Sequence, residues 1–109
     1  MILAALPQAG GSVKNRPAVA LRIMRPYGDM LVCGVSTQLR QMVPDFDEEI
    51  GRLDADFAES GLLADSIIRL GFLAVLPRQC ILGSIGTISN ERHQRLLHRL
   101  GAYLVEESE

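Results

Sequence analysis

The stretch KNRPAVALRIMRPYGDMLVCGVS, residues 14–36, holds two apolar runs on either side of a turn. Residues 17–24 open with Pro17, which is tolerated at the first position of a strand because its missing N–H need not break the ladder. Residues 25–29 have the composition of a turn, and residues 30–36 form the second apolar run. The stretch therefore predicts a β-hairpin.

Short apolar runs outside this hairpin predict further strands. They cover residues 2–6, 66–70, 71–76, 79–82 and 84–87. Asp54 is expected to cap a short helix that closes at residues 60–61, and Ser89 to cap an amphipathic C-terminal helix with Arg92 on an outward face. Short strands with two helices and little room for long crossovers indicate a mainly β (α+β) fold, a small and mostly antiparallel barrel.

Length and composition limit the classes of protein that the chain can belong to. With 109 residues, 48% of them apolar and 22% charged, it has the profile of one globular domain over residues 1–109. No apolar run is long enough to span a bilayer, and the opening run stops at Pro7 with no basic flank before it. These features predict a cytoplasmic protein without a membrane partner.

The cysteines and histidines do not have the spacing of a metal site. Cys33 and Cys80 each lie inside an apolar stretch, which favours buried free thiols over a disulfide. The chain contains no CxxC and no HExxH motif. We therefore expect no metal and no cofactor.

Charges of opposite sign are separated along the chain, although the formal net charge is only −2. The residues up to Pro44 are mainly basic, whereas residues 45–59 are mainly acidic. Such asymmetry can give an anionic protein one cationic face. Charge alone favours the simpler interpretation of two ordinary solvated faces.

A series of short motifs follows one order along nearly the whole chain. KNRPAVAL is followed by GVSTQL, ESGLLADSIIR, GSIGTIS and the amphipathic C-terminal helix. In this order the sequence resembles the MazF/PemK family of toxin endoribonucleases from bacterial type II toxin–antitoxin modules. The resemblance implies an SH3-like barrel, a homodimer, metal-independent cutting of single-stranded RNA such as mRNA, growth inhibition, and a cognate antitoxin protein as partner.

The resemblance also implies a set of site residues. Family members use an arginine of an (R/K)-R-P motif and a threonine of a T-x-Q motif, and these positions fall on Arg16 and Ser36 as the catalytic residues. The residues expected to bind substrate are Lys14, Asn15, Thr37 and Gln38. Ser36 lacks the methyl group that stiffens a threonine side chain, Asn15 stands where the family often has a second base, and the Gly-Asp or Gly-Glu start is absent.

These residue types suit cleavage of RNA without a metal. The planar guanidinium of Arg16 can hold two phosphate oxygens and stays charged, although it is a poor base. A hydroxyl of Ser36 or Thr37 can donate to the same phosphate, and Gln38 can contact a base edge. The expected products carry a 2′,3′-cyclic phosphate and a 5′-hydroxyl.

Plainer interpretations of the same residues stay open. Arg16 can be a solvated strand end, residues 36–38 can form an ordinary turn, and Arg69 can be either an RNA contact or an exposed side chain. Core packing is expected of Phe72, and stacking on a base is considered only for Tyr27 and Phe46. The alternative functions are an inactive MazF/PemK-like barrel that binds RNA or protein, and an unrelated small barrel that binds a peptide strand.

Overall fold

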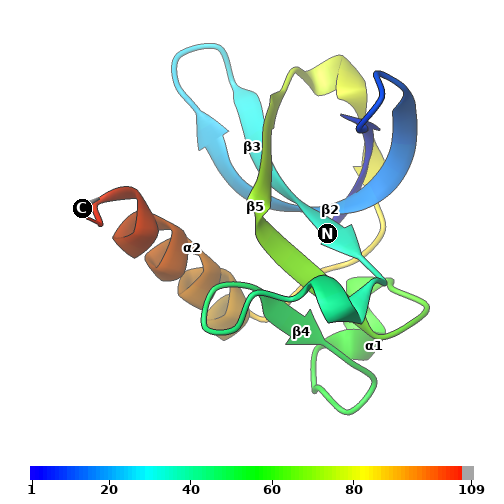
Figure 1. Ribbon diagram of the computed structural model, residues 1–109. Helices are drawn as coiled ribbons and strands as arrows, with labels where there is room; N and C mark the ends of the chain where they lie inside the picture. Colours follow the sequence, from blue (N-terminus) through cyan, green and yellow to red (C-terminus); the bar gives the residue numbers. More distant parts are fainter. Residues whose placement is uncertain (107–109) are drawn as a thin grey trace.

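The computed structural model of the protein describes residues 1–106 (Figure 1). Within these residues a six-stranded antiparallel sheet has the order β4-β5-β3-β2-β1-β6 and curls into a barrel-like form. The strands are β1 (Ile2–Pro7), β2 (Val13–Met24), β3 (Asp29–Ser36), β4 (Glu48–Ile50), β5 (Ser66–Leu76) and β6 (Ile81–Ser84); the helices are α1 (Phe57–Ser60) and α2 (Asn90–Leu104), with 3₁₀ turns at Leu39–Gln41 and Arg78–Cys80. The mainly β fold with a short middle helix and a C-terminal helix is confirmed.

The predicted hairpin is formed by β2 and β3. The two strands pair antiparallel, and their last pair is Ala18 with Gly34, so Arg16 and Ser36 each lie two residues beyond this pair at the same end of the hairpin. β2 begins earlier than expected, at Val13, because its first half pairs with β1, whereas its second half pairs with β3. Pairing with Ala4 of β1 fixes the backbone at Arg16.

β5 is one long strand interrupted by a bulge, whereas the sequence predicted two strands that meet at Gly71. Cys33 of β3 pairs with Leu73, but the next residue, Gly34, pairs with Arg69. Residues 70–72 of β5 therefore have no partner between these two pairs. The glycine that resembled a break between strands instead marks a bulge, at which a strand bends without ending.

The bulge changes which side chains face each side of the sheet. Leu70 packs into the cluster that includes α2, whereas Phe72, only two residues later, packs against the cluster on the other side. Strict alternation would have put both side chains on the same face. The backbone N–H of Leu70, which has no partner on β3 because of the bulge, donates instead to Oδ1 of buried Asp47 at 3.1 Å.

Two apolar clusters occupy the two sides of the curled sheet. The larger lies between the sheet and α2, which covers the outside of the curl in Figure 1, and it includes Val19, Cys33, Ile68, Leu96 and Leu100. The smaller, inside the curl, includes Ala4, Leu6, Ala18, Val32 and Leu76. Because both faces of β2 and β3 are covered, the hairpin forms the centre of the fold.

The cysteines are free, as expected. Cys33 is fully buried, and Cys80 is half-buried. Burial, reinforced by the nearby charge of Asp47, raises the pKa of the Cys33 thiol to about 12. Cys33 is therefore a core side chain and not a nucleophile.

The helix ends agree only in part with the sequence predictions. Ser89 caps α2, and its hydroxyl accepts from the N–H of Arg92 at 3.1 Å. The α1 cap is Asp56 and not Asp54, whose carboxylate accepts from the N–H of Gly51 at 2.8 Å instead. The predicted strand over residues 84–87 does not form beyond Ser84. None of the helices in residues 1–106 is both long and apolar enough to pass through a membrane.

Gly86 is required by a close backbone crossing. A Cβ at this position would overlap the carbonyl oxygens of Glu59 and Ser60, which cannot move independently of α1. We expect Gly86→Ala to lower the free energy of unfolding by about 3 kcal/mol in urea titrations. Gly101→Ala is the matched control: no atom lies within 4 Å of the added Cβ, so this helical substitution should raise stability by about 0.5–1 kcal/mol.

Candidate functional site

A pocket lies where the start of β2 meets the end of β3 and the bulge of β5. Its volume is about 230 Å³, and we call it the arginine pocket. Its lining residues are Leu6, Gln8, Arg16, Gly34, Val35, Ser36, Thr37, Gln38, Gln41, Arg69 and Phe72. Four of the six residues that the sequence predicted as site residues are therefore together in one place.

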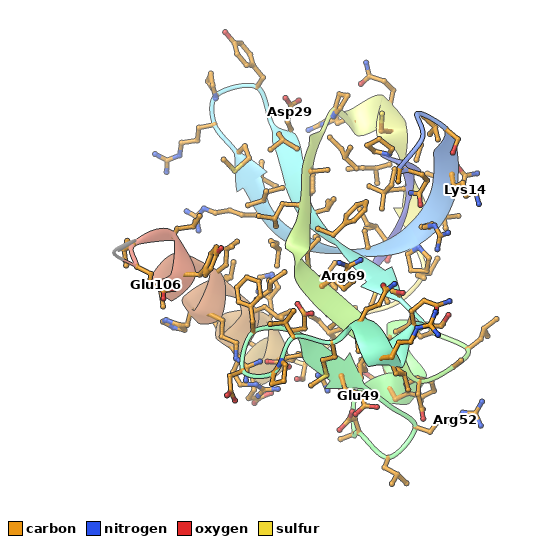
Figure 2. The ribbon with its side chains drawn as sticks, viewed as in Figure 1. Lys14, Asp29, Glu49, Arg52, Arg69 and Glu106 are labelled. Carbon is orange, nitrogen blue, oxygen red and sulfur yellow. The ribbon has the colours of Figure 1, made fainter. Side chains whose placement is uncertain are left out.

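Two guanidinium groups, those of Arg16 and Arg69, line this pocket. Arg16 is exposed and Arg69 half-buried, and in the part of the chain that the structure describes neither forms an ion pair. Figure 2 shows Arg69 beside β5, near the centre of the molecule. Two unneutralised cations around one small pocket make it suited to an anion with several oxygens, such as a phosphate.

Ser36, Thr37 and Gln38 form a turn at the pocket rim. The N–H of Gln38 donates to Oγ of Ser36 at 3.0 Å, and the 3₁₀ turn Leu39–Gln41 follows directly. These residues therefore do form a strand end and a turn, as the plainer interpretation expected. The turn uses only a lone pair of the Ser36 oxygen, so the hydroxyl proton of Ser36 is available to donate to a ligand.

A second hollow of about 320 Å³ adjoins the arginine pocket, and we call it the leucine pocket. Arg16, Ser36 and Thr37 line both pockets, so they form the ridge between them. The far side of the leucine pocket carries apolar side chains, including Leu62 and Leu63. A chain molecule lying across the ridge would place one unit in each pocket.

The structure does not bring Lys14 and Asn15 into either pocket. Lys14 lies on the same face of β2 as Arg16 but one pleat further along, and Asn15 faces the opposite side. Figure 2 shows Lys14 at the outer rim of the curled sheet. Their predicted contact with substrate stays a prediction for a ligand that extends beyond the pockets.

Two buried carboxylates of the acidic segment, those of Glu48 and Asp56, are neutralised by arginines of α2. Arg92, only 5% exposed, donates through Nε to Oδ2 of Asp56 at 2.8 Å and through Nη1 to Oε1 of Glu48 at 2.9 Å. Arg95 and Arg99 reach the same Glu48 carboxylate at 3.0 and 3.3 Å. These residues form what we call the Arg92 network, and it joins α2 to β4 and to the start of α1.

This network explains how a chain with net negative charge has a cationic pocket. Carboxylates of the acidic segment are held by α2, on the far side of the sheet from the curl that contains Phe72. Arg92 was expected on an outward face, and that prediction is wrong. A signal was present in the sequence, because arginines at 92, 95 and 99 recur with the spacing of one helix face.

The hydrogen bonds from Arg92 hold the pKa of Asp56 down, from its ordinary value of 3.8 to about 2, against the opposing effect of burial. The N–H of Ser89 also donates to this carboxylate, at 2.9 Å. The ionised form is thus the one that the fold stabilises. Among residues 1–106 no cluster of three or more His, Cys, Asp or Glu side chains could hold a metal ion.

No protein-family model matches this chain, and no curated protein matches it. The features that point to a function are therefore the arginine pocket and the motifs of the sequence.

Removal of Arg92 should be far more damaging than removal of its exposed neighbour. We expect Arg92→Met to lower the free energy of unfolding by about 3–5 kcal/mol, because Asp56 and Glu48 lose a buried partner. Arg95→Ala is the control: its side chain is 50% exposed and pairs with the same Glu48, so we expect a loss of at most about 1 kcal/mol. Urea unfolding at neutral pH measures both.

The same titrations at lower pH test the cause. Because the pKa of Asp56 is lower in the folded protein than in the unfolded chain, its stabilisation is complete above pH about 4 and lost as pH falls towards about 2. Arg92→Met should lack this part of the pH dependence. If the stability of Arg92→Met falls at low pH as steeply as that of the wild type, Asp56 is not the group responsible for this pH dependence.

Proposed function

We propose that this protein is a metal-independent endoribonuclease that cuts single-stranded RNA across the ridge formed by Arg16, Ser36 and Thr37. One observation carries the proposal: the guanidinium groups of Arg16 and Arg69, which form no ion pair within residues 1–106, line the same pocket as two hydroxyl side chains. A phosphate on the ridge would have a cation beside it and a hollow for a neighbouring unit on either side.

In this proposal the protein acts on the charge of the reacting phosphate. The 2′-oxygen of the RNA forms a bond to phosphorus while the bond to the 5′-oxygen breaks. The 2′-hydroxyl proton passes to water, and the departing 5′-oxygen takes up a proton, leaving a 2′,3′-cyclic phosphate and a 5′-hydroxyl. Arg16 stabilises the charge that develops on the phosphate, and Ser36 donates to one of its oxygens.

The biological setting follows from the resemblance to the MazF/PemK family. We propose that the protein is the toxin of a toxin–antitoxin module, acts in the cytoplasm on mRNA, and inhibits growth. Its proposed partners are a second copy of itself, in a homodimer, and a cognate antitoxin.

A second candidate is an inactive barrel of the same kind that binds RNA without cutting it. One observation favours it: within residues 1–106, no imidazole and no side-chain carboxylate lines the arginine pocket. A phosphate can therefore be bound there while nothing in the pocket readily accepts the proton of the 2′-hydroxyl. Binding and cleavage must be measured separately.

The first test is cleavage of a long single-stranded RNA in EDTA. We expect the wild-type protein to cut it and leave cyclic phosphate ends, and Arg16→Ala to lower the rate at least about 100-fold because a group that stabilises the transition state is lost. The control is Arg22→Ala, which removes the same charge from an exposed position on β2 outside both pockets.

The outcomes separate the two candidates. Equal cutting by wild type and Arg16→Ala would contradict the site. Salt-dependent binding of RNA that Arg16→Ala weakens, without cutting by either protein, would establish the binding module in place of the enzyme. Neither cutting nor binding by folded wild-type protein would contradict both.

The two ridge hydroxyls can be distinguished by matched truncations. We expect Ser36→Ala to lower the cleavage rate about 100-fold, Ser36→Thr to preserve most of it, and Thr37→Ala to have a small effect. Ser36→Thr keeps both the acceptor for the Gln38 N–H and the donor, so it controls for loss of the turn. If Ser36→Ala leaves the cleavage rate unchanged and Thr37→Ala lowers it, the hydroxyl that donates to the phosphate is that of Thr37.

A further inference from the structure

Phe72 occupies a position in the arginine pocket that the sequence did not predict. Core packing was expected, and the side chain does contact the inner apolar cluster, but it is only half-buried and also lines the pocket. Tyr27, considered in the sequence for stacking, is 88% exposed in the hairpin turn, away from both pockets. Phe46, the other candidate, packs on Tyr103 with ring centroids 4.9 Å apart.

The ring of Phe72 rests on Gly34. A Cβ added at Gly34 would lie 2.9 Å from Cδ1, 3.2 Å from Cγ and 3.5 Å from Cε1 of the ring. One side of the ring thus occupies the space that a side chain would fill if position 34 held any residue other than glycine. Gly34 itself also lines the pocket, so the glycine and the ring together form its floor.

The bulge in β5 places this ring beside a cation. Because the alternation of side chains shifts between Leu70 and Phe72, Arg69 and Phe72 line the same pocket. The pocket therefore combines one aromatic ring with the guanidinium groups of Arg69 and Arg16. A nucleotide has the matching parts, which are a flat base and a phosphate.

We propose that Phe72 is a binding residue that stacks on one base of single-stranded RNA, while Arg16 holds the adjoining phosphate. This inference rests on the proposed function. A volume of about 230 Å³ suits a single base better than a larger ligand. Because every base has a flat face, stacking here strengthens binding with little preference among sequences.

The experiment compares two probes of equal length and charge. One is a labelled 2′-O-methyl RNA of about 12 nucleotides, which cannot be cut because its 2′-oxygens are blocked. The other has the same sugar–phosphate backbone without bases. The ratio of their dissociation constants measures the contribution of the bases, and phosphate contacts cancel.

We expect wild type to prefer the probe with bases, and Phe72→Leu to reduce that preference about 5- to 150-fold, whereas Phe72→Tyr should preserve it. Phe57→Leu is the matched control, since it makes the same change in a half-buried ring outside both pockets. Arg16→Ala should weaken binding of both probes and leave their ratio unchanged.

Failure of this inference is distinguishable from failure of the proposed function. If wild type binds both probes equally, or if Phe72→Leu keeps the wild-type preference, the stacking role is wrong while RNA binding at the arginines stands. If folded wild-type protein binds neither probe, the proposed function is wrong and the stacking role fails with it.

Discussion

The bulge of β5 opposite Gly34 is the constraint on which both the core and the candidate site depend. Ile68 and the first residue of the bulge, Leu70, fill the cluster beneath α2, whereas the last residue of the bulge, Phe72, and Leu76 contribute to the cluster inside the curl. A regular strand would have kept Leu70 and Phe72 on one face. The same bulge brings Phe72 into the pocket that Arg69 lines, so packing and site geometry have one cause.

Local patterns were sufficient to predict the hairpin and the meeting of Arg16 with Ser36. The register of an antiparallel hairpin follows from its two apolar runs and the turn between them, so the proximity could be inferred before any tertiary contact was known. The bulge could not be predicted in this way. It depends on the fit of the Phe72 ring over Gly34 and on Asp47, distant in sequence, accepting from the N–H of Leu70.

The burial of Arg92 illustrates a different limit of sequence reasoning. An arginine on an amphipathic helix is normally solvated, and only the whole set of its partners makes burial favourable. These partners come from β4 and from the start of α1, more than thirty residues earlier in the chain. The acidic run and the helical arginines were both visible in the sequence, but their pairing is a property of the tertiary fold.

This pairing determines what the arginine pocket can do. Glu48 and Asp56 are paired with Arg92 of α2, and no carboxylate of the acidic segment lines the arginine pocket, so none competes there with a phosphate for Arg16 and Arg69. The pocket is then strong in positive charge and poor in proton acceptors. Any rate acceleration must come from holding the phosphate in place and stabilising the charge that develops on it, because proton transfer is left to water. Whether the protein is an enzyme or a binding module therefore depends on whether the ridge of Arg16, Ser36 and Thr37 fits the transition state better than it fits the bound RNA.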